Sequence, residues 1–386
     1  MLRLWISFFV LVTFFTLYAC TPPSSDITDK AISSGVQIFN ENEPVNTIKS
    51  SDSEIRIQAT GLSVLVLGSG GPDGVDDDRA SSGYVIYVEG KPKILMDTGG
   101  GSYERLIQAE VNLKDLEIIL LTHLHIDHTS DLSAILKLIY FQNRIAGTFR
   151  TAPFHIYGPE MNGIPFPDTT IAQYPSVSEY VDQHYHMEVG IERYLNIFAK
   201  AISGGDFGYM SHDLSSDVTE PESELINENG LVVKAIAVDH GPVPAVAFRI
   251  DYNGRSIVYS GDTTSKTDNM ITFSQDADLV FYDTAITDTL PGDIISKLHT
   301  TPTRMGEVVT AANVKTLILT HLTGTTLPRL FEVAQAVTAQ GFVGKIQVAE
   351  DLEVYHLGTT PITPPPVSTT PSPGSSLSKT PVVELP

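Results

Sequence analysis

Four side chains of types that bind metal ions lie within six residues of one another in Thr122-His123-Leu124-His125-Ile126-Asp127-His128. This segment follows the apolar run 116–121, which is typical of a buried strand. A loop at the end of a strand holds imidazoles and carboxylates at fixed angles, and zinc takes His nitrogen and Asp oxygen as ligands. Three His and one Asp in one loop can therefore serve two adjacent metals. The alternative is a surface loop that is His-rich by chance, and the residues described next disfavour it.

Three further apolar runs end in a residue of the same kind. They end at His240 after residues 231–239, at Asp262 after residues 256–260 and at His321 after residues 314–320. Gly261 allows a tight turn, so that the side chain of Asp262 can point back toward the other residues. Seven candidate ligands at the ends of separate strands form a specific pattern that composition alone does not produce.

The His-x-His-x-Asp-His pattern after an apolar strand resembles the signature of the metallo-β-lactamase-fold hydrolases. The Gly-Asp-Thr motif at 261–263 and the His-Gly-Pro motif at 240–242 resemble the branch that contains ribonuclease Z and the related phosphodiesterases and arylsulfatases. The resemblance covers about residues 61–357. It implies an α/β fold, the four-layer αββα sandwich of this family.

The resemblance also implies a role for each candidate ligand. One metal is expected on His123, His125 and His240, and the other on Asp127, His128 and His321, with Asp262 bridging them. We expect two zinc ions per chain, with manganese or iron open as alternatives for a carboxylate-bridged pair. Two such metals lower the pKa of a shared water from about 16 to about 7, which gives a hydroxide nucleophile at neutral pH. Asp97, in an Asp-x-Gly element, is expected to support the metal loop rather than to bind metal.

Asp262, His299 and Asp127 are the expected catalytic residues. His299 fits no metal position, and it precedes a predicted helix over residues 304–312. In the ribonuclease Z branch, a His in this place assists the leaving group as a general acid. Asp283, in the predicted strand 279–285, could fix the tautomer of His299. The alternative is that His299 is structural.

The predicted elements place these residues at the ends of strands. Strands are predicted at 62–68, 83–88, 92–97, 116–121, 154–160, 231–240, 245–250, 256–263, 279–285, 314–321, 345–351 and 352–355, and helices at 103–110, 130–138, 304–312 and 327–340. From about 161 to 228, Pro, Ser and acidic residues dominate, and we interpret this stretch as an acidic insert that forms a lid or a wall of the substrate site. His155, inside the predicted strand 154–160, is expected to be structural, and we expect surface or pocket positions for His184, His186 and His212.

Both ends of the chain lack a core-forming pattern. Arg3 and the apolar residues 4–19 are typical of a signal peptide, and Leu17-Tyr18-Ala19-Cys20 resembles a bacterial lipobox. Residues 1–20 are therefore predicted to be a lipoprotein signal peptide, and lipidated Cys20 is expected to anchor the exported protein to a bacterial membrane, facing the periplasm or the cell surface. A plain secretory signal is the alternative. Residues 21–60 are predicted to be a flexible tether, and residues 358–386 a disordered Pro/Ser/Thr-rich tail.

Charge bears on the choice of partner. The chain has 24 Lys and Arg against 46 Asp and Glu, a formal net charge of -22, and this surface repels nucleic-acid phosphates. In ribonuclease Z the stretch that corresponds to 151–230 lies near the basic surfaces that grip tRNA, whereas here it has thirteen Asp and Glu but only Arg193 and Lys200. The expected partner is therefore a small-molecule ester, and nucleic acid is not expected. A homodimer is possible, because this family is often dimeric.

Three functions fit these observations. The first is an exported, lipid-anchored dinuclear zinc hydrolase that uses a metal-bridging hydroxide to cleave phosphodiester, sulfate or related ester bonds. The second is β-lactam hydrolysis, which export favours, but which the His299 element disfavours because ring opening needs less help to a leaving oxygen. The third is a non-catalytic surface lipoprotein, which the complete set of seven ligands disfavours. The sequence does not give the substrate, which we expect the insert to select.

Overall fold

The computed structural model describes residues 60–74, 78–165, 168–172, 174–289 and 295–358. The predicted signal peptide at 1–20 with Cys20, and nearly all of the predicted tether at 21–60 and tail at 358–386, lie outside the described residues. Within the described part of the chain, no helix combines the length and the apolar character that crossing a membrane requires. The helices and strands below all lie between Leu62 and Leu357.

The first sheet has seven strands in the order β14-β1-β2-β3-β4-β5-β6. The neighbours from β14 to β3 are antiparallel, and those from β3 to β6 are parallel. The strands are β1 (Leu62–Gly68), β2 (Gly83–Val88), β3 (Lys91–Thr98), β4 (Ile118–Leu120), β5 (Phe154–Pro159), β6 (Tyr209–Leu214) and β14 (Val354–Leu357). The β2–β3 hairpin turns at Glu89 and Gly90, as predicted, and both residues have positive φ.

The second sheet also has seven strands, in the order β13-β12-β11-β10-β9-β8-β7. The neighbours from β7 to β10 are antiparallel, and those from β10 to β13 are parallel. The strands are β7 (Ser223–Glu228), β8 (Leu231–His240), β9 (Val243–Tyr252), β10 (Arg255–Tyr259), β11 (Leu279–Asp283), β12 (Thr316–Thr320) and β13 (Lys345–Val348).

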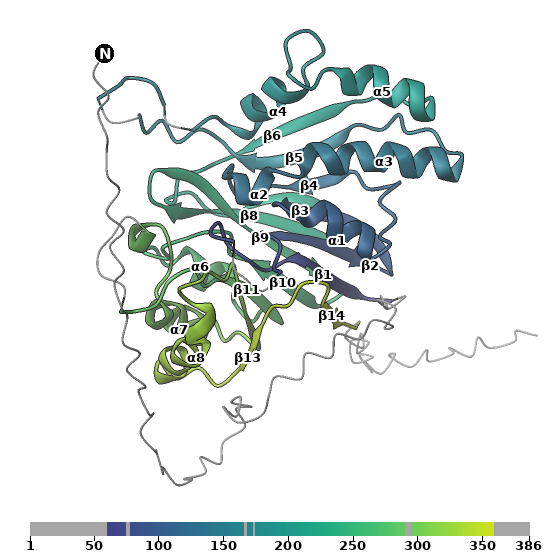
Figure 1. Ribbon diagram of the computed structural model, residues 1–386. Coiled ribbons are helices and arrows are strands. Elements are labelled where there is room, and N and C mark those ends of the chain that lie inside the picture. Colours follow the sequence, from purple (N-terminus) through teal and green to yellow (C-terminus); the bar gives the residue numbers. More distant parts are fainter. Residues whose placement is uncertain (1–59, 75–77, 166–167, 173, 290–294, 359–386) are drawn as a thin grey trace, which may run out of the picture. The chain divides into compact units, whose positions relative to one another are not determined.

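The two sheets pack face to face, and helices cover their outer faces (Figure 1). The central core joins apolar side chains of both sheets, such as Val64 and Phe248, which are fully buried. Fully burying one such side chain stabilises the fold by about 1.5–3 kcal/mol. The first sheet is covered by α1 (Ser102–Gln108), α3 (Leu132–Ala146), α4 (Val177–Tyr185) and α5 (Tyr194–Ser203), and the second by α6 (Asn269–Phe273), α7 (Pro302–Ala311) and α8 (Leu330–Ala339). This arrangement confirms the predicted αββα sandwich.

The candidate site residues lie at one edge of the sandwich, where several strands end. Asp97 lies near the end of β3, His240 ends β8, Asp283 ends β11 and His321 follows β12. Carboxyl ends of parallel strands meet at one edge of a sheet, which is where ligands bind in many α/β folds. The carbonyl of Thr122 accepts a hydrogen bond from the amide of Val246 in β9 at 2.9 Å, so the loop after β4 is tied to the second sheet.

The stretch 161–228 differs from the predicted insert, because it contains regular structure that belongs to both sheets. β6 forms one edge of the first sheet and β7 one edge of the second. Both strands are polar and only partly buried, so their sequences lack the apolar alternation that predicts a strand. The segment between β5 and α4 is the part that lies near the candidate site, and it is described below.

Candidate metal centre

Hydrogen bonds to Asp97 hold the loop that carries the His-x-His-x-Asp-His motif. One oxygen of this fully buried carboxylate accepts the backbone N–H of Thr122 at 2.8 Å, and the other accepts the Thr122 hydroxyl at 2.8 Å. Asp97 Oδ2 also lies 2.7 Å from His128 Nδ1. These contacts confirm that Asp97 supports the loop, and they leave Nε2 of His128 as the nitrogen that faces the site.

A first group of possible ligands consists of His123, His125, His240 and Asp262, whose ligand atoms lie within 4.8 Å of one another. His123 Nε2 lies 3.0 Å from His125 Nδ1. Both His123 Nε2 and His240 Nε2 lie 3.8 Å from Asp262 Oδ2. Three imidazoles and one carboxylate oxygen thus converge, a donor set that suits zinc.

A second group consists of Asp127, His128 and His321. Asp127 Oδ2 lies 3.4 Å from His128 Nε2 and 3.2 Å from His321 Nε2. The other oxygen of Asp262, Oδ1, lies 3.4 Å from His128 Nε2 and 3.3 Å from His321 Nε2. The two oxygens of Asp262 therefore face different groups of possible ligands.

Several buried polar atoms of these groups have no hydrogen-bond partner among the described residues. They are Nε2 of His128, Nε2 of His240, Nδ1 of His321 and Oδ1 of Asp262. An unpaired buried polar group costs about 1–3 kcal/mol, which binding of a cation would offset. Imidazole nitrogen with carboxylate oxygen suits zinc and other divalent transition metals. The residues present therefore fit divalent metal binding.

The electrostatics of the two groups also favour cations. Burial lowers the pKa of His240 to about 4, so its imidazole is neutral at pH 7. Burial acts in the same direction on His321, but Asp262 and Asp127 outweigh it and raise the pKa of His321 to about 10. The carboxylates thus stabilise positive charge on the second group, and a divalent cation would supply that charge in place of a proton.

His299 and Asp283 lie next to the two groups. His299 Nδ1 is 2.8 Å from Asp283 Oδ2, which confirms the predicted contact between them. Burial alone would lower the pKa of His299, but Asp283 outweighs it and raises that pKa above its usual value. His299 Nδ1 is also 3.9 Å from Asp262 Oδ2. Asp283 and His299 form a third possible ligand group with Asp262 and His321.

The backbone at the site is held in conformations that L-residues rarely adopt. Gly261 has a φ of 54°, and a Cβ there would lie 2.8 Å from Cβ of Thr122, so the turn before Asp262 requires glycine. Asp97 and His321 have φ values of 50° and 56° without being glycine. Such residues persist only where their surroundings hold them, and they cluster at functional sites.

One residue of the site was not predicted from the sequence. The hydroxyl of Tyr174 lies 3.3 Å from His125 Nε2, and the two rings meet at an angle of 65°. Tyr174 comes from the segment between β5 and α4, within the predicted insert. No motif surrounds it, so only the path of that segment in space could identify it.

The other histidines of this region do not join the metal-binding groups found among the described residues. His155 in β5 stacks on His212 in β6, with their ring nitrogens 3.1 Å apart. His184 Nδ1 lies 2.8 Å from the carbonyl of Tyr180 within α4. The stacking agrees with the structural role expected for His155, and the contact of His184 lies within its own helix.

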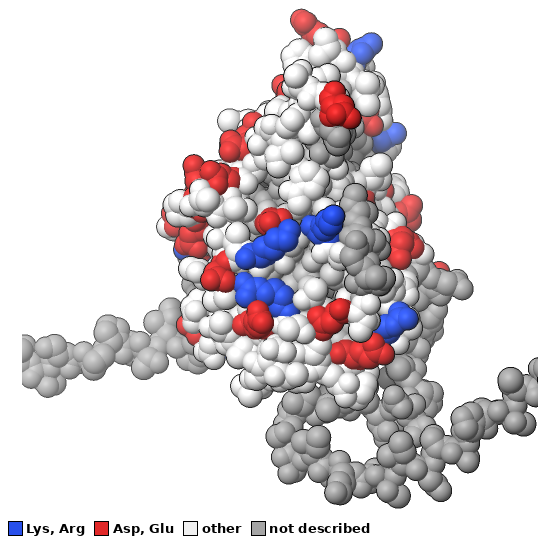
Figure 2. Space-filling view, turned by 90° about the vertical axis from the view of Figure 1, so that its left-hand side faces the viewer, with Lys and Arg blue, Asp and Glu red and all other residues white. Residues whose placement is uncertain are grey.

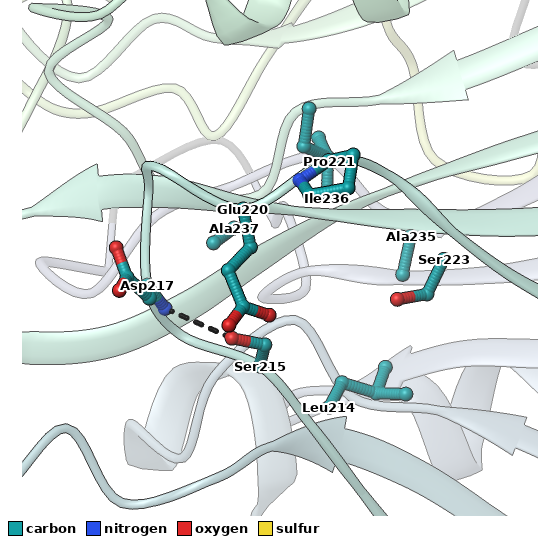
Figure 3. Close-up of a pocket in the computed structure, with 9 residues that line it drawn as sticks. All are labelled: Leu214, Ser215, Asp217, Glu220, Pro221, Ser223, Ala235, Ile236 and Ala237. Carbon is teal, nitrogen blue, oxygen red and sulfur yellow. Dashed lines mark hydrogen bonds between the residues drawn. The ribbon is translucent and has the colours of Figure 1, made fainter.

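A small surface pocket lies between the chain around β6 and β7 and the strand β8 (Figure 3). Its lining includes Asp217, Glu220 and Ala237, and the amide of Asp217 donates to Ser215 Oγ at 3.3 Å. None of the residues that line it belongs to the His and Asp groups described above. We therefore assign the chemistry to the strand-end groups and not to this pocket.

Comparisons with known proteins agree with this geometry. Residues 76–304 match the model of the metallo-beta-lactamase superfamily. The chain is 28% identical over 308 residues to ribonuclease Z of Mycobacterium bovis (strain BCG / Pasteur 1173P2), which covers 75% of this chain and 96% of that protein. It is 24% identical over 306 residues to ribonuclease Z of Mycobacterium marinum (strain ATCC BAA-535 / M), which covers 75% of this chain and 97% of that protein.

Two solved structures share the fold. The metallo-beta-lactamase fold protein YhfI from Bacillus subtilis superposes with a TM-score of 0.55 at 20% identity, over 76% of this chain and 98% of that protein. The short form of human tRNase Z superposes with a TM-score of 0.53 at 22% identity, over 76% of this chain and 98% of that protein. The matched family model spans more than half of the chain and includes six of the seven candidate ligands. The chain therefore belongs to the metallo-beta-lactamase superfamily, and it is a metal-dependent hydrolase.

Proposed function

We propose that this protein is an exported dinuclear zinc hydrolase that cleaves phosphodiester, sulfate or related ester bonds in small anionic molecules. The observation that carries the proposal is the position of Asp262, whose two oxygens face two separate groups of ligands. The identity and number of the metals, the ester class and the membrane anchor through Cys20 are parts of the proposal.

The chain's own residues have distinct tasks in this reaction. His123, His125 and His240 would hold one metal, and Asp127, His128 and His321 the other, with Asp262 shared. When bound, a pair of divalent metals supplies an activated water at neutral pH and offsets the negative charge that develops on the ester.

His299 would supply the proton that the leaving oxygen needs. Its Nδ1 is bound to Asp283, which leaves Nε2 to act toward the substrate. Asp283 raises the pKa of His299 above its usual value, which favours the charged imidazole that a general acid requires. Asp283 holds the ring in one orientation, and this fixed position is part of the catalytic effect.

The charge around the site favours an anionic substrate. Figure 2 shows the side of the molecule on which α6 lies in Figure 1, with Lys and Arg side chains gathered near the middle of that face and Asp and Glu around them. Lys266 lies just before α6, and its ammonium is 3.8 Å from a carboxylate oxygen of Asp239, next to His240. Lys297 is exposed, and the carbonyl of Leu298 beside it accepts a hydrogen bond from His240 Nδ1 at 2.7 Å. These lysines would attract a phosphate or sulfate ester.

Two other substrates remain candidates. The similarity to ribonucleases Z makes RNA a possible substrate, so the prediction that nucleic acid is not a partner stays to be tested. β-Lactam hydrolysis is the second alternative; its ring opening breaks a C–N bond, so it has no leaving oxygen for the His299–Asp283 pair to protonate.

The test is hydrolysis of bis-p-nitrophenyl phosphate, p-nitrophenyl sulfate, nitrocefin and a short RNA by the zinc-loaded protein, beside its Asp262→Ala variant. We expect one of the two nitrophenyl esters to be cleaved and the variant to be inactive. Turnover of nitrocefin alone would establish the lactamase alternative, and cleavage of RNA alone would establish a nuclease. A chain that binds no metal would refute the proposal altogether.

Self-association is supported by exposed apolar side chains on α3, α5 and the loops beside them. The most exposed of these side chains are Ile145, Phe149, Met187, Val189, Ile191 and Ile197, each at least 69% exposed. Contiguous exposed apolar patches are typical of protein interfaces. We expect light scattering to give the mass of a dimer and Ile197→Asp to give a monomer. A monomeric wild-type protein at high concentration would contradict this expectation.

A further inference from the structure

The imidazoles of the proposed metal centre differ in where their outer partners come from. A histidine that binds a metal through one ring nitrogen usually donates the N–H of the other to a fixed acceptor, which sets the tautomer and the direction of the ring. His123 Nδ1 lies 3.2 Å from the Thr122 hydroxyl, and His240 Nδ1 lies 2.7 Å from the carbonyl of Leu298. Thr122 belongs to the loop that carries His123, and Leu298 directly precedes His299, the proposed general acid.

His125 is the exception. Its Nδ1 faces His123 Nε2 at 3.0 Å, so Nδ1 is the nitrogen that points into the first group. Its Nε2 points away from that group and lies 3.3 Å from the hydroxyl of Tyr174. With Nδ1 as the ligand atom, Nε2 carries the hydrogen, and this N–H donates a hydrogen bond to the hydroxyl oxygen of Tyr174. The ring of Tyr174 also packs against the imidazole, with centroids 5.7 Å apart.

The segment that carries Tyr174 is attached to the first group at a second place. The side-chain amide of Asn162 donates to the carbonyl of Pro242 at 3.0 Å, two residues after His240. Between these attachments, Pro165 and Ala172 pair as an isolated β-bridge, so the segment folds back on itself. It thus contacts both of the loops that supply imidazoles to the first group.

We propose that Tyr174 is a positioning residue for the first metal, and that its contact with His125 completes that half of the centre. The hydroxyl accepts the N–H of His125 Nε2, and this holds Nδ1 toward the metal. The inference rests on the metal centre of the proposed function and adds that residues outside the ligand motifs determine its metal affinity.

The consequence is selective for one metal. Tyr174→Phe keeps the ring that packs on His125 and removes the hydroxyl that accepts its N–H. Loss of such an outer partner typically weakens metal binding by about 10- to 100-fold. The second group has its own partner, because Asp97 binds His128 Nδ1 at 2.7 Å, so its metal affinity should not change.

The experiment titrates the metal-free full-length protein with zinc against a chromophoric chelator, for the wild type and two variants. Tyr209→Phe is the matched control, because it removes a tyrosine hydroxyl that donates to Asp182 at 2.8 Å, within the same stretch 161–228. We expect Tyr174→Phe to weaken one of two zinc equivalents by about 10- to 100-fold. The control should bind both equivalents as the wild type does, and the unfolding temperature of the metal-free Tyr174→Phe variant should match that of the wild type.

Other outcomes separate the possible errors. Two zinc equivalents bound by Tyr174→Phe with wild-type affinity would overturn the inference and leave the proposed function intact. Equal weakening of both equivalents, together with a lower unfolding temperature, would also overturn it, because the role would then be structural. A wild-type chain that binds no zinc would refute the proposed function and this inference with it.

Discussion

The pair formed by His299 and Asp283 gives the most specific prediction about the reaction. Asp283→Asn keeps the size of the side chain but removes the charge that binds His299 Nδ1 at 2.8 Å. A hydrogen bond to a charged group contributes about 1.5–3 kcal/mol. Each 1.36 kcal/mol corresponds to a factor of ten in rate, so kcat should fall by about 10- to 150-fold for an ester whose leaving oxygen needs a proton. For bis-p-nitrophenyl phosphate, whose phenolate leaves without protonation, kcat should change much less.

The pH dependence of kcat gives an independent check of the same pair. Burial lowers the pKa of His299, but Asp283 outweighs it and raises that pKa above the usual value of 6.5. A general acid must be protonated, so the activity it supports is present below the raised pKa and is lost as the pH rises through it. In Asp283→Asn the pKa falls, and the alkaline limb of the profile for an alkyl ester should move to lower pH.

Asp278→Asn is the matched control for this experiment. Asp278 is also a buried carboxylate, but it binds the amide of Ser256 and the side chain of Lys315 and lies outside the His and Asp groups. The Asp278→Asn variant should therefore have the same ratio of alkyl-ester to aryl-ester hydrolysis rates as the wild type. The assignment of His299 as general acid would be refuted if Asp283→Asn slowed both esters equally, or if neither rate changed.

Three further predictions follow from the charges around the site. His128 and His321 have raised pKa values, the latter about 10, so zinc binding at neutral pH should release protons and tighten as the pH rises. Calorimetry in two buffers of different ionisation enthalpy measures this release, and identical apparent enthalpies would contradict it. Asp97→Asn removes the negative charge that binds His128 Nδ1 and should weaken zinc binding by about 10- to 100-fold. Unchanged zinc affinity in a chelator titration would contradict this prediction. Replacing Lys266 and Lys297 with Glu should lower kcat/KM for an anionic diester, and the wild-type value should fall with added salt; a salt-independent kcat/KM would exclude a role for these charges.

The strands that could be predicted from the sequence are those with buried residues on both faces. β1 and β2 are buried along their whole length, because one face packs on the other sheet and the other on helices. Such strands are continuous apolar runs, and the predicted bounds of these two agree with the structure. The chemistry-bearing residues follow such runs directly, which is why their convergence could also be foreseen.

The parts that could not be predicted lack this burial. β6 carries Tyr209, His212 and Asp213 on an edge where few side chains are buried, so its sequence does not differ from that of a loop. The contact between Tyr174 and His125 depends on the path of a segment whose described residues form no helix or named strand. An apolar pattern in the sequence predicts where a residue lies in the fold only if that residue is buried. The residues of β6 and Tyr174 are mostly not buried, so no such pattern marks them.

The charge of the whole chain and the charge at the edge of the site act over different lengths. Electrostatic interactions between exposed groups are screened beyond about 8–10 Å at physiological salt. A small anionic ester at the site would respond to the nearby charges, which include Lys266, Lys297 and Asp239, more than to the net charge of -22 of the whole chain. An RNA extends over several such lengths and would also meet the acidic surface, including the stretch 151–230 with its thirteen carboxylates. The size of the anion, rather than its chemical class alone, is therefore expected to separate this protein's substrates from the RNA after which its mycobacterial relatives are named.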